Sequence, residues 1–347
     1  MLVKYFGLVN DTGSNSLSPR SNFLTNGLFR MTQPKYLNDQ GSEARLWPYF
    51  NNFSPADYAW AKREYAKIQL NKSYIPSNEE LENLFLKPTG LRYGDSFPHL
   101  LTNEGFKTMK DYDFAQLKLI TQKINKFLVE AISCQLGILS LSKSDTNELM
   151  WTHYASDGRG LAVSFKQEHE FFKMFTPKDV CYAPERRASL TYYKGMVRLN
   201  GSPLKHYHLN ELQNPINIIN SLSKNEIDIV DLSERILYSK DQKWSYEDEV
   251  RVVCPLSYCE VSYGKSIKPQ FEVELPIEMN GLFIEYPEVC LKQIPFDAFE
   301  SIIFGYNTKE SDRMDIVNVI QSNRELSHIK LQVAKHNIFG SIEITNY

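Results

Sequence analysis

Residues 240–254 read Lys-Asp-Gln-Lys-Trp-Ser-Tyr-Glu-Asp-Glu-Val-Arg-Val-Val-Cys, so a run of charges and aromatics leads directly into a segment rich in valine. β-Branched residues of this kind are typical of a buried strand. Because side chains alternate along a strand, we expect Glu247, Glu249 and Arg251 on one face of it. Two carboxylates and a guanidinium that enter a core need partners or a chemical role, which makes this stretch the first candidate for a functional site.

The composition of the 347 residues is that of a folded protein with one large domain or two ordinary ones. Hydrophobic residues make up 42% and charged residues 23%, which excludes wholesale disorder. The formal net charge of −3 provides no strong overall attraction to nucleic acid or to an anionic membrane. Aromatic residues reach 13%, which suits a β-containing core or pockets that stack planar ligands.

The five cysteines, an odd number in a long chain, do not indicate a disulfide framework. We expect them to be reduced and mostly buried; they are Cys134, Cys181, Cys254, Cys259 and Cys290. The first residues form no signal-peptide core, and no window approaches the roughly 18 uninterrupted apolar residues of a membrane span. The sequence therefore predicts a cytoplasmic protein without membrane association.

Strand and helix signals are scattered along the chain, which predicts an α+β fold with a mixed or antiparallel central sheet. We expect strands in the opening stretch and at 2–6, 27–32, 138–142, 161–165, 180–182, 190–197, 266–275, 281–284, 301–306, 328–333 and 341–345. We expect helices at 55–71, 77–86, 112–136 with Gly137 as a stop, 147–154, 214–238 and 313–323. The prediction is a single domain over residues 1–347, with helical insertions around 55–136 and 210–240.

Several segments together resemble an uncharacterised bacterial family, the domain of unknown function 2971 family. Two of the motifs are specific: Leu-Met-Trp-Thr-His-Tyr-Ala at 149–155 and Lys-Trp-Ser-Tyr-Glu-Asp-Glu-Val-Arg at 243–251. Weaker similarity lies at 28–39 and in the Ile-Ile-Phe-Gly segment at 302–305. The chain has Gln40 in a region where the family usually has proline, which affects the expected local turn. The resemblance spans nearly the whole chain, and the family name carries no function.

A looser resemblance links the opening stretch to ADP-ribosyltransferases, which place a catalytic glutamate at the start of a late strand of a split sheet. Glu247-Asp248-Glu249, followed by Val-Arg-Val-Val, is similar to the Glu-x-Glu version of that motif. The resemblance implies a split central sheet and NAD as a substrate, with no tightly bound cofactor. It also implies a protein or nucleic-acid acceptor or simple hydrolysis of NAD, in a toxin or phage-defence effector.

The same resemblance implies roles for residues of both specific motifs. Breaking the bond between nicotinamide and ribose passes through an oxocarbenium-like state, which Glu249 would stabilise. Glu247 would orient or deprotonate an acceptor, and His153 would hydrogen-bond the nicotinamide. The other expected substrate contacts are stacking by Tyr154 or Trp244, phosphate pairing by Arg159 or Arg251, and a contact from Tyr5 on the first strand.

Each of these residues also has a structural interpretation. The carboxylates and Arg251 can form an ion pair between strands, His153 can bond a backbone carbonyl, and the aromatic residues can pack in the core. Arg159 lies between two glycines, which suits a solvated turn as well as a phosphate contact. Two other functions therefore stay open: a non-catalytic binding or regulatory domain, and a metal-dependent nuclease or hydrolase built from His153, Glu247, Glu249 and Asp39.

Overall fold

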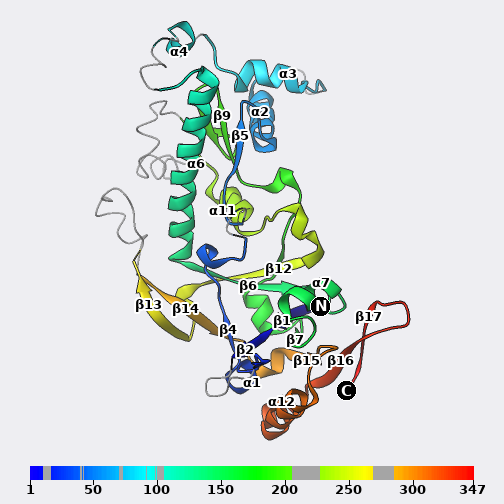
Figure 1. Ribbon diagram of the computed structural model, residues 1–347. Helices are drawn as coiled ribbons and strands as arrows, with labels where there is room; N and C mark the ends of the chain where they lie inside the picture. The colour runs from blue at the N-terminus through cyan, green and yellow to red at the C-terminus, as the bar shows by residue number, and fades with distance from the viewer. Residues whose placement is uncertain are drawn as a thin grey trace.

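A computed structural model of the chain describes residues 1–10, 17–39, 41, 43–69, 73–90, 92–97, 99, 105–204, 227–268 and 285–347. These residues form a mixed α+β fold, which confirms the fold class expected from the sequence. In Figure 1 a large sheet occupies the lower part of the molecule, and a smaller sheet with its helices lies above it. The long helix α6 (Met109–Ser133) runs along this upper part toward the large sheet.

Eight strands form the large sheet in the order β17-β16-β15-β7-β1-β6-β12-β8. The strands are β1 (Leu2–Phe6), β6 (Leu136–Ser142), β7 (Leu161–Phe165), β8 (Lys178–Asp179), β12 (Glu249–Pro255), β15 (Phe299–Phe304), β16 (Lys330–His336) and β17 (Ile342–Asn346). Neighbouring strands are antiparallel except β15 and β16, which are parallel, so the sheet is mixed. The strand predicted in the opening stretch is β12, an interior strand paired with β6.

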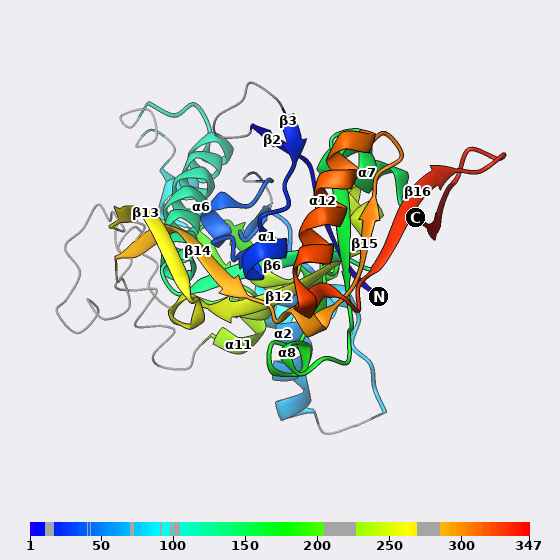
Figure 2. The same ribbon diagram turned by 90° about the horizontal axis from the view of Figure 1, so that it is seen from below.

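Both faces of the large sheet are covered, which explains the nearly continuous apolar sequence of its central strands. Helix α12 (Glu310–Ser322) packs on one face through Ile316 and Ile320, and Figure 2 shows it alongside β15. Helix α7 (Glu148–Tyr154) packs on the other face through the fully buried Trp151. This second face is the one on which α7 approaches the turn before β12.

A four-stranded sheet of order β11-β10-β9-β5 packs against α6 and α11. Its elements are β5 (Trp47–Phe50), β9 (Ser189–Tyr193), β10 (Met196–Leu199), β11 (Ser202–Pro203) and α11 (Ile229–Leu237). The helices beside it are α2 (Pro55–Ile68), α3 (Asn78–Leu81) with a π-helical turn (Glu82–Leu86), and α4 (Tyr93–Ser96). Ser54 and Ser77 begin α2 and α3 with capping boxes, which accounts for the helix starts expected there.

A three-stranded sheet lies next to the lower end of α6, in the order β13-β14-β4 (Figure 1). Its strands are β13 (Val261–Ile267), β14 (Tyr286–Gln293) and β4 (Leu28–Arg30). A bridge between Thr32 and Ile138 ties the chain after β4 to β6 of the large sheet. The remaining short elements are the paired strands β2 (Leu8–Asn10) and β3 (Leu17–Pro19) and the helices α1 (Phe23–Asn26) and α8 (Glu170–Met174).

Some predicted elements differ from the structure for local reasons. The strand predicted at 190–197 is a hairpin, because Lys194 and Gly195 have φ values of 45° and 86° and turn the chain between β9 and β10. Gly137 does not stop α6, which ends at Ser133. It lies inside β6, where a Cβ atom would come within 2.5 Å of Met31 Cβ, so glycine is needed for close packing.

Some strands of the structure were not predicted, and some predicted elements are shorter or lie outside the described ranges. The sequence did not predict β5 or β14, and residues 180–182 contribute only a bridge between Cys181 and Ser239. The strand predicted at 281–284 and parts of 214–238 and 266–275 lie outside the described residues. All five cysteines are free, as expected.

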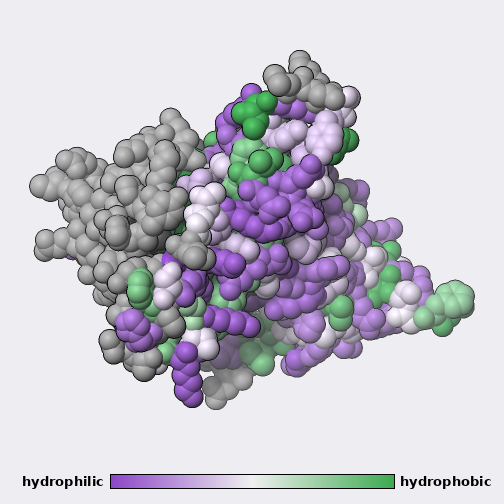
Figure 3. Space-filling view, turned by 90° about the horizontal axis from the view of Figure 1, so that it is seen from above, coloured by the Kyte–Doolittle hydropathy of each residue, from purple (hydrophilic) through white to green (hydrophobic). Residues whose placement is uncertain are grey.

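Hydrophilic residues prevail among the coloured residues of the face in Figure 3, with apolar side chains scattered among them. In the described ranges, no helix combines the length and the hydropathy that a bilayer crossing requires.

Candidate functional site

A cleft of about 870 Å³ opens between the central strands of the large sheet and the three-stranded sheet. Strands β1 and β6 line one side of it, and residues of β4, β13 and β14 line the other. Its charged lining residues are Lys4, Arg20, Arg30, Glu43, Lys240, Glu247 and Glu249. Both carboxylates singled out in the sequence therefore face the same cleft, and Tyr154 lines it beside them.

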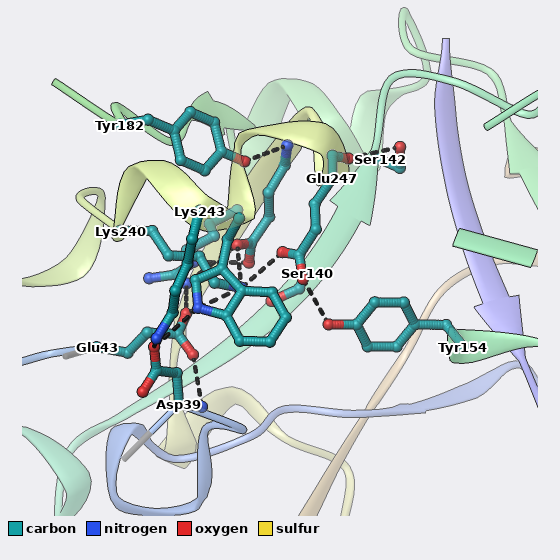
Figure 4. A network of polar contacts seen from close by, with 12 residues as sticks. Asp39, Glu43, Ser140, Ser142, Tyr154, Tyr182, Lys240, Lys243 and Glu247 are labelled. Atoms are coloured by element: carbon teal, nitrogen blue, oxygen red, sulfur yellow. Dashed lines mark hydrogen bonds and ion pairs between the residues drawn. The ribbon is translucent and has the colours of Figure 1, made fainter. Parts of the chain in front are cut away.

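Lys240 lies at the centre of the carboxylates in this cleft (Figure 4). Its Nζ atom is 2.6 Å from Glu247 Oε2, 3.2 Å from Glu249 Oε2 and 3.3 Å from Glu43 Oε1. All four side chains are buried, with 5% or less of each residue exposed. Burial lowers the pKa of the Lys240 ammonium, but Glu249, Glu43 and Glu247 outweigh it and raise the pKa above its ordinary value. Lys240 is therefore a charged group that holds the three acids together.

Arg251 is the second cation of the cluster and is fully buried. Its Nε donates to Glu249 Oε1 at 2.8 Å, and its Nη2 donates to Glu249 Oε2 at 3.1 Å and to Glu43. Its Nη1 donates to the carbonyl of Leu237 at 2.7 Å, which ties β12 to the end of α11. Every nitrogen of Arg251 thus has a protein acceptor, and its geometry is that of a structural partner.

Glu249 is held as an anion by these neighbours. Burial alone would raise its pKa, but Arg251 and Lys240 lower it to about 2. Both of its carboxylate oxygens accept from Arg251, and its backbone N–H donates to the hydroxyl of Tyr182 at 2.9 Å. Burial in turn raises the pKa of Tyr182 to about 12, so this hydroxyl is neutral near pH 7. Glu249 is the most rigidly bound carboxylate of the cluster.

Glu247 occupies a different backbone position from the one that strand alternation predicted. It ends a 3₁₀ helix (Gln242–Glu247), and Asp248 follows with a φ of 42°, so β12 begins only at Glu249. The turn nevertheless directs the Glu247 carboxylate to the hydroxyl of Tyr154, which donates to Oε1 at 2.5 Å. The Ser142 hydroxyl donates to the Glu247 carbonyl at 2.8 Å and fixes the turn against β6. The Glu247 carboxylate is thus bound by one tyrosine and one lysine and forms no ion pair with Arg251.

Trp244 lies between Lys240 and Asp39, and Figure 4 shows Asp39 close to Lys243. The indole Nε1 of Trp244 donates to Asp39 Oδ2 at 2.8 Å, and Lys243 Nζ is 3.2 Å from the same oxygen. The Lys240 ammonium lies 5.1 Å from the centroid of the Trp244 ring. The ring of Trp244 is therefore engaged by Lys240 and does not line the cleft.

Three further residues expected at the site lie elsewhere or point away from the carboxylates. His153 is exposed on α7, outside the described lining of the cleft, and its ring packs against Tyr246 with 6.1 Å between centroids. Arg159 is exposed in the turn after α7, where its Nε donates to the Ser156 carbonyl at 2.9 Å. Tyr5 borders the cleft, but its hydroxyl donates to the Ser144 carbonyl at 2.8 Å, and its ring packs edge-on against Trp151.

Glu43, Lys240 and Lys4 belong to the site, although sequence reasoning did not select them. Lys240 is the first residue of the opening stretch, and its position seven residues before Glu247 was the available signal. Glu43 follows the weaker family-like segment by four residues, and its Oε2 accepts from the backbone N–H of Asp39 at 3.1 Å. Nothing in the sequence alone indicates that this loop reaches Arg251.

The carboxylates of the cluster do not form a metal site in the described ranges of the chain. No group of three or more His, Cys, Asp and Glu side chains there has a metal-binding arrangement. Lys240 occupies the position between the three glutamates where a cation would bind, and Asp39 is paired with Lys243. The set His153, Glu247, Glu249 and Asp39 is therefore not assembled around one point.

Comparison with known proteins identifies one segment of the chain. The model of the family DUF2971, described as a protein of unknown function, matches residues 150–252. This match confirms the resemblance in the region of the two specific motifs, and it contains Tyr154, Lys240, Glu247, Glu249 and Arg251. The segments at 28–39 and 302–305 lie outside it. No curated protein and no solved structure matches the chain.

Proposed function

We propose that the cleft binds NAD and that the protein consumes it in a reaction of the ADP-ribosyltransferase type, as a transferase or as an NAD glycohydrolase. One observation carries the proposal: Glu247 and Glu249 line a cleft of about 870 Å³, and only Glu249 is clamped by Arg251. A cleft of this size is in the range that encloses small-molecule ligands. We therefore assign the role of reacting carboxylate to Glu247 in place of Glu249.

The proposed reaction breaks the bond between the nicotinamide nitrogen and C1′ of the ribose. The bonding electron pair leaves with nicotinamide, which becomes neutral, and positive charge develops on the ribosyl carbon and its ring oxygen. A buried anion next to this centre stabilises the transition state, because the surroundings are already oriented and water is largely absent. An acceptor oxygen or nitrogen, or a water, then forms the new bond to C1′ and releases its proton to a base.

The contacts of Glu247 suit this role. Tyr154 and Lys240 each hold one of its oxygens, so the carboxylate has a fixed direction before any ligand arrives. Burial, followed by the hydrogen bond to Glu247, raises the pKa of Tyr154 above its ordinary value, which keeps its hydroxyl a donor near pH 7. Lys240 is paired with Glu249 and Glu43, and Arg251 is paired with Glu43 in turn. We assign these three partners a positioning role.

Nicotinamide release from NAD tests the proposal directly. The wild-type protein is expected to release nicotinamide with or without added protein or nucleic-acid acceptors, and Glu247→Gln is expected to abolish the release while keeping the fold. Arg63→Ala, an exposed change on α2 away from the cleft, serves as the matched control. Absence of nicotinamide release from the wild type under all these conditions would refute the proposal, and release by Glu247→Gln at the wild-type rate would remove Glu247 from it.

A non-catalytic binding domain is the second candidate, and the complete pairing of Glu249 and Arg251 favours it, since buried ion pairs often have structural roles. This alternative predicts ligand binding without nicotinamide release. The metal-dependent hydrolase is less well supported, because Lys240 already neutralises the acids that would bind the metal.

The proposed activity also suggests a cellular role as a toxin or phage-defence effector in the cytoplasm. Expression of the wild type in bacterial cells is then expected to lower the NAD content and arrest growth. Expression of Glu247→Gln at the same level is expected to do neither. Growth arrest by both forms would separate toxicity from NAD consumption.

A further inference from the structure

Two exposed arginines line the cleft without an acidic partner among the residues that the structure describes. Arg20 follows β3 and Arg30 ends β4, and both side chains are exposed on the cleft. Within the described part of the chain, neither guanidinium forms an ion pair; Arg30 lies 6.0 Å from the ring centroid of Tyr36. These two cations are therefore available to an anionic ligand.

Lys4 of β1 lines the same cleft and is half-buried. Its Nζ donates to the carbonyl of Ser140 at 2.9 Å, which leaves the ammonium with further donors. Burial lowers the pKa of Lys4 to about 8, and the positive charge of Arg20 contributes in the same direction. An anion bound next to Lys4 and Arg20 would stabilise the charged ammonium, and it would thereby oppose the lowering of the Lys4 pKa by burial and by Arg20.

The charged residues of the cleft differ in burial. Three acids, Glu43, Glu247 and Glu249, are buried together with Lys240, whereas Arg20 and Arg30 are exposed. Lys4 stands between these two groups in burial. A ligand with anionic groups at one end and a centre of developing positive charge at the other would therefore bind in one direction.

We propose that Lys4, Arg20 and Arg30 form a subsite for the diphosphate of a nucleotide, which orients the ligand with its ribosyl bond toward Glu247. Guanidinium groups pair with phosphate oxygens through two parallel hydrogen bonds, and the lysine adds a compact charge. The amides of Asn22 and Asn26 line the same part of the cleft and can donate to the remaining phosphate oxygens. The direction of binding rests on the proposed function, whereas the subsite requires only phosphate recognition.

Calorimetric titration of the full-length protein with ADP tests the subsite without any catalytic step. ADP is expected to bind, pyrophosphate to compete with it, and adenosine to bind far more weakly. Arg20→Ala and Arg30→Ala are each expected to weaken ADP binding by about tenfold, the size of one charge-assisted hydrogen bond. Because both arginines are exposed, thermal unfolding should be unchanged, and Arg63→Ala should bind ADP like the wild type.

The outcomes separate this subsite from the proposed reaction. Wild-type affinity for ADP in both arginine variants, equal affinity for ADP and adenosine, or no binding of ADP at all would overturn the subsite. ADP binding that depends on the arginines, in a protein that releases no nicotinamide, would support the subsite and overturn the reaction. Nicotinamide release that is unaffected by Arg20→Ala with Arg30→Ala would support the reaction and overturn the subsite.

Discussion

The ammonium of Lys240 lies 2.6 Å from the carboxylate of Glu247, and this contact ties the last residue of the 3₁₀ helix before β12 to a residue just ahead of that helix. The same ammonium reaches Glu249 at 3.2 Å, so one cation fixes two carboxylates that belong to different backbone elements. The site is thereby organised around Lys240. The orientation of Glu247 depends on the carboxylates that hold Lys240 in place, and a ligand does not need to contact them.

Replacement of Arg251 by methionine is expected to destabilise the protein strongly. The change removes the guanidinium between Glu43 and Glu249 and leaves two buried carboxylates with Lys240 as their remaining cation. Loss of one partner from a buried ion pair costs about 3–5 kcal/mol of unfolding free energy, which urea denaturation measures. Lys243→Met, at a largely exposed lysine, is the control and should cost less than about 1 kcal/mol. Equal stability of the two variants would contradict a structural role for Arg251.

Tyr154→Phe should slow the proposed reaction more than it changes the fold. It keeps the ring and removes the hydroxyl that donates to Glu247 Oε1. A hydrogen bond to a charged group contributes about 1.5–3 kcal/mol, so the rate of nicotinamide release should fall by about tenfold or more. Tyr246→Phe is the matched control, because Tyr246 contacts Asn147 through its backbone carbonyl and not through its hydroxyl. A wild-type rate for Tyr154→Phe would show that this hydroxyl does not position the reacting carboxylate.

The low pKa of Glu249 predicts a loss of stability in acid. Its pKa falls from an ordinary 4.5 to about 2 on folding, so its anion stabilises the folded state above about pH 4.5. As the pH drops from 4.5 toward 2, about 3 kcal/mol of unfolding free energy should disappear. Urea denaturation at a series of pH values measures this slope. Glu249→Gln should be less stable at neutral pH and show a flatter dependence; a slope equal to that of the wild type would assign the effect to other acids.

Binding of ADP should weaken in alkaline solution because of Lys4. Its pKa is lowered to about 8 in the free protein by burial and by Arg20 and Lys240, although Glu249 and Glu247 act in the opposite direction. A bound phosphate favours the charged lysine, so affinity is expected to fall as the pH rises through 8. Calorimetric titration at several pH values measures this. Lys4→Met should bind ADP more weakly at pH 7 and lose the dependence, whereas an unchanged pH profile would exclude Lys4 from the subsite.

Gly137→Ala should destabilise the junction between the large sheet, at β6, and the three-stranded sheet, at the end of β4. An added methyl group would lie 2.5 Å from Met31 Cβ and 3.1 Å from the Met31 carbonyl carbon. Overpacking of this kind costs about 1–3 kcal/mol, since backbone atoms must move to relieve it. Urea denaturation measures this loss of unfolding free energy. The affinity for ADP should also fall, because Met31 follows the cleft residue Arg30.

Local sequence patterns predicted much of the secondary structure. The strands β1, β7 and β15 and the helices α2 and α12 follow from apolar periodicity, which acts over a few positions. The patterns failed where a contact distant in sequence decides the conformation. Gly137 is the clearest case, because its small size serves Met31 and not the end of a helix.

For the site, the sequence by itself determined that Glu249 and Arg251 share one face of a buried strand, since their spacing and the valines around them are local facts. It did not determine the position of Glu247, which ends the 3₁₀ helix before that strand. Only the tertiary structure decided how they are used. It brings Glu43 to Arg251 across 208 positions and Tyr154 to Glu247 across 93, and no pattern of a few residues records such contacts. Glu43 thereby joins Arg251, the cation that clamps Glu249, and Tyr154 directs Glu247 at the cleft, because a buried carboxylate takes the state that its nearest cations and donors stabilise.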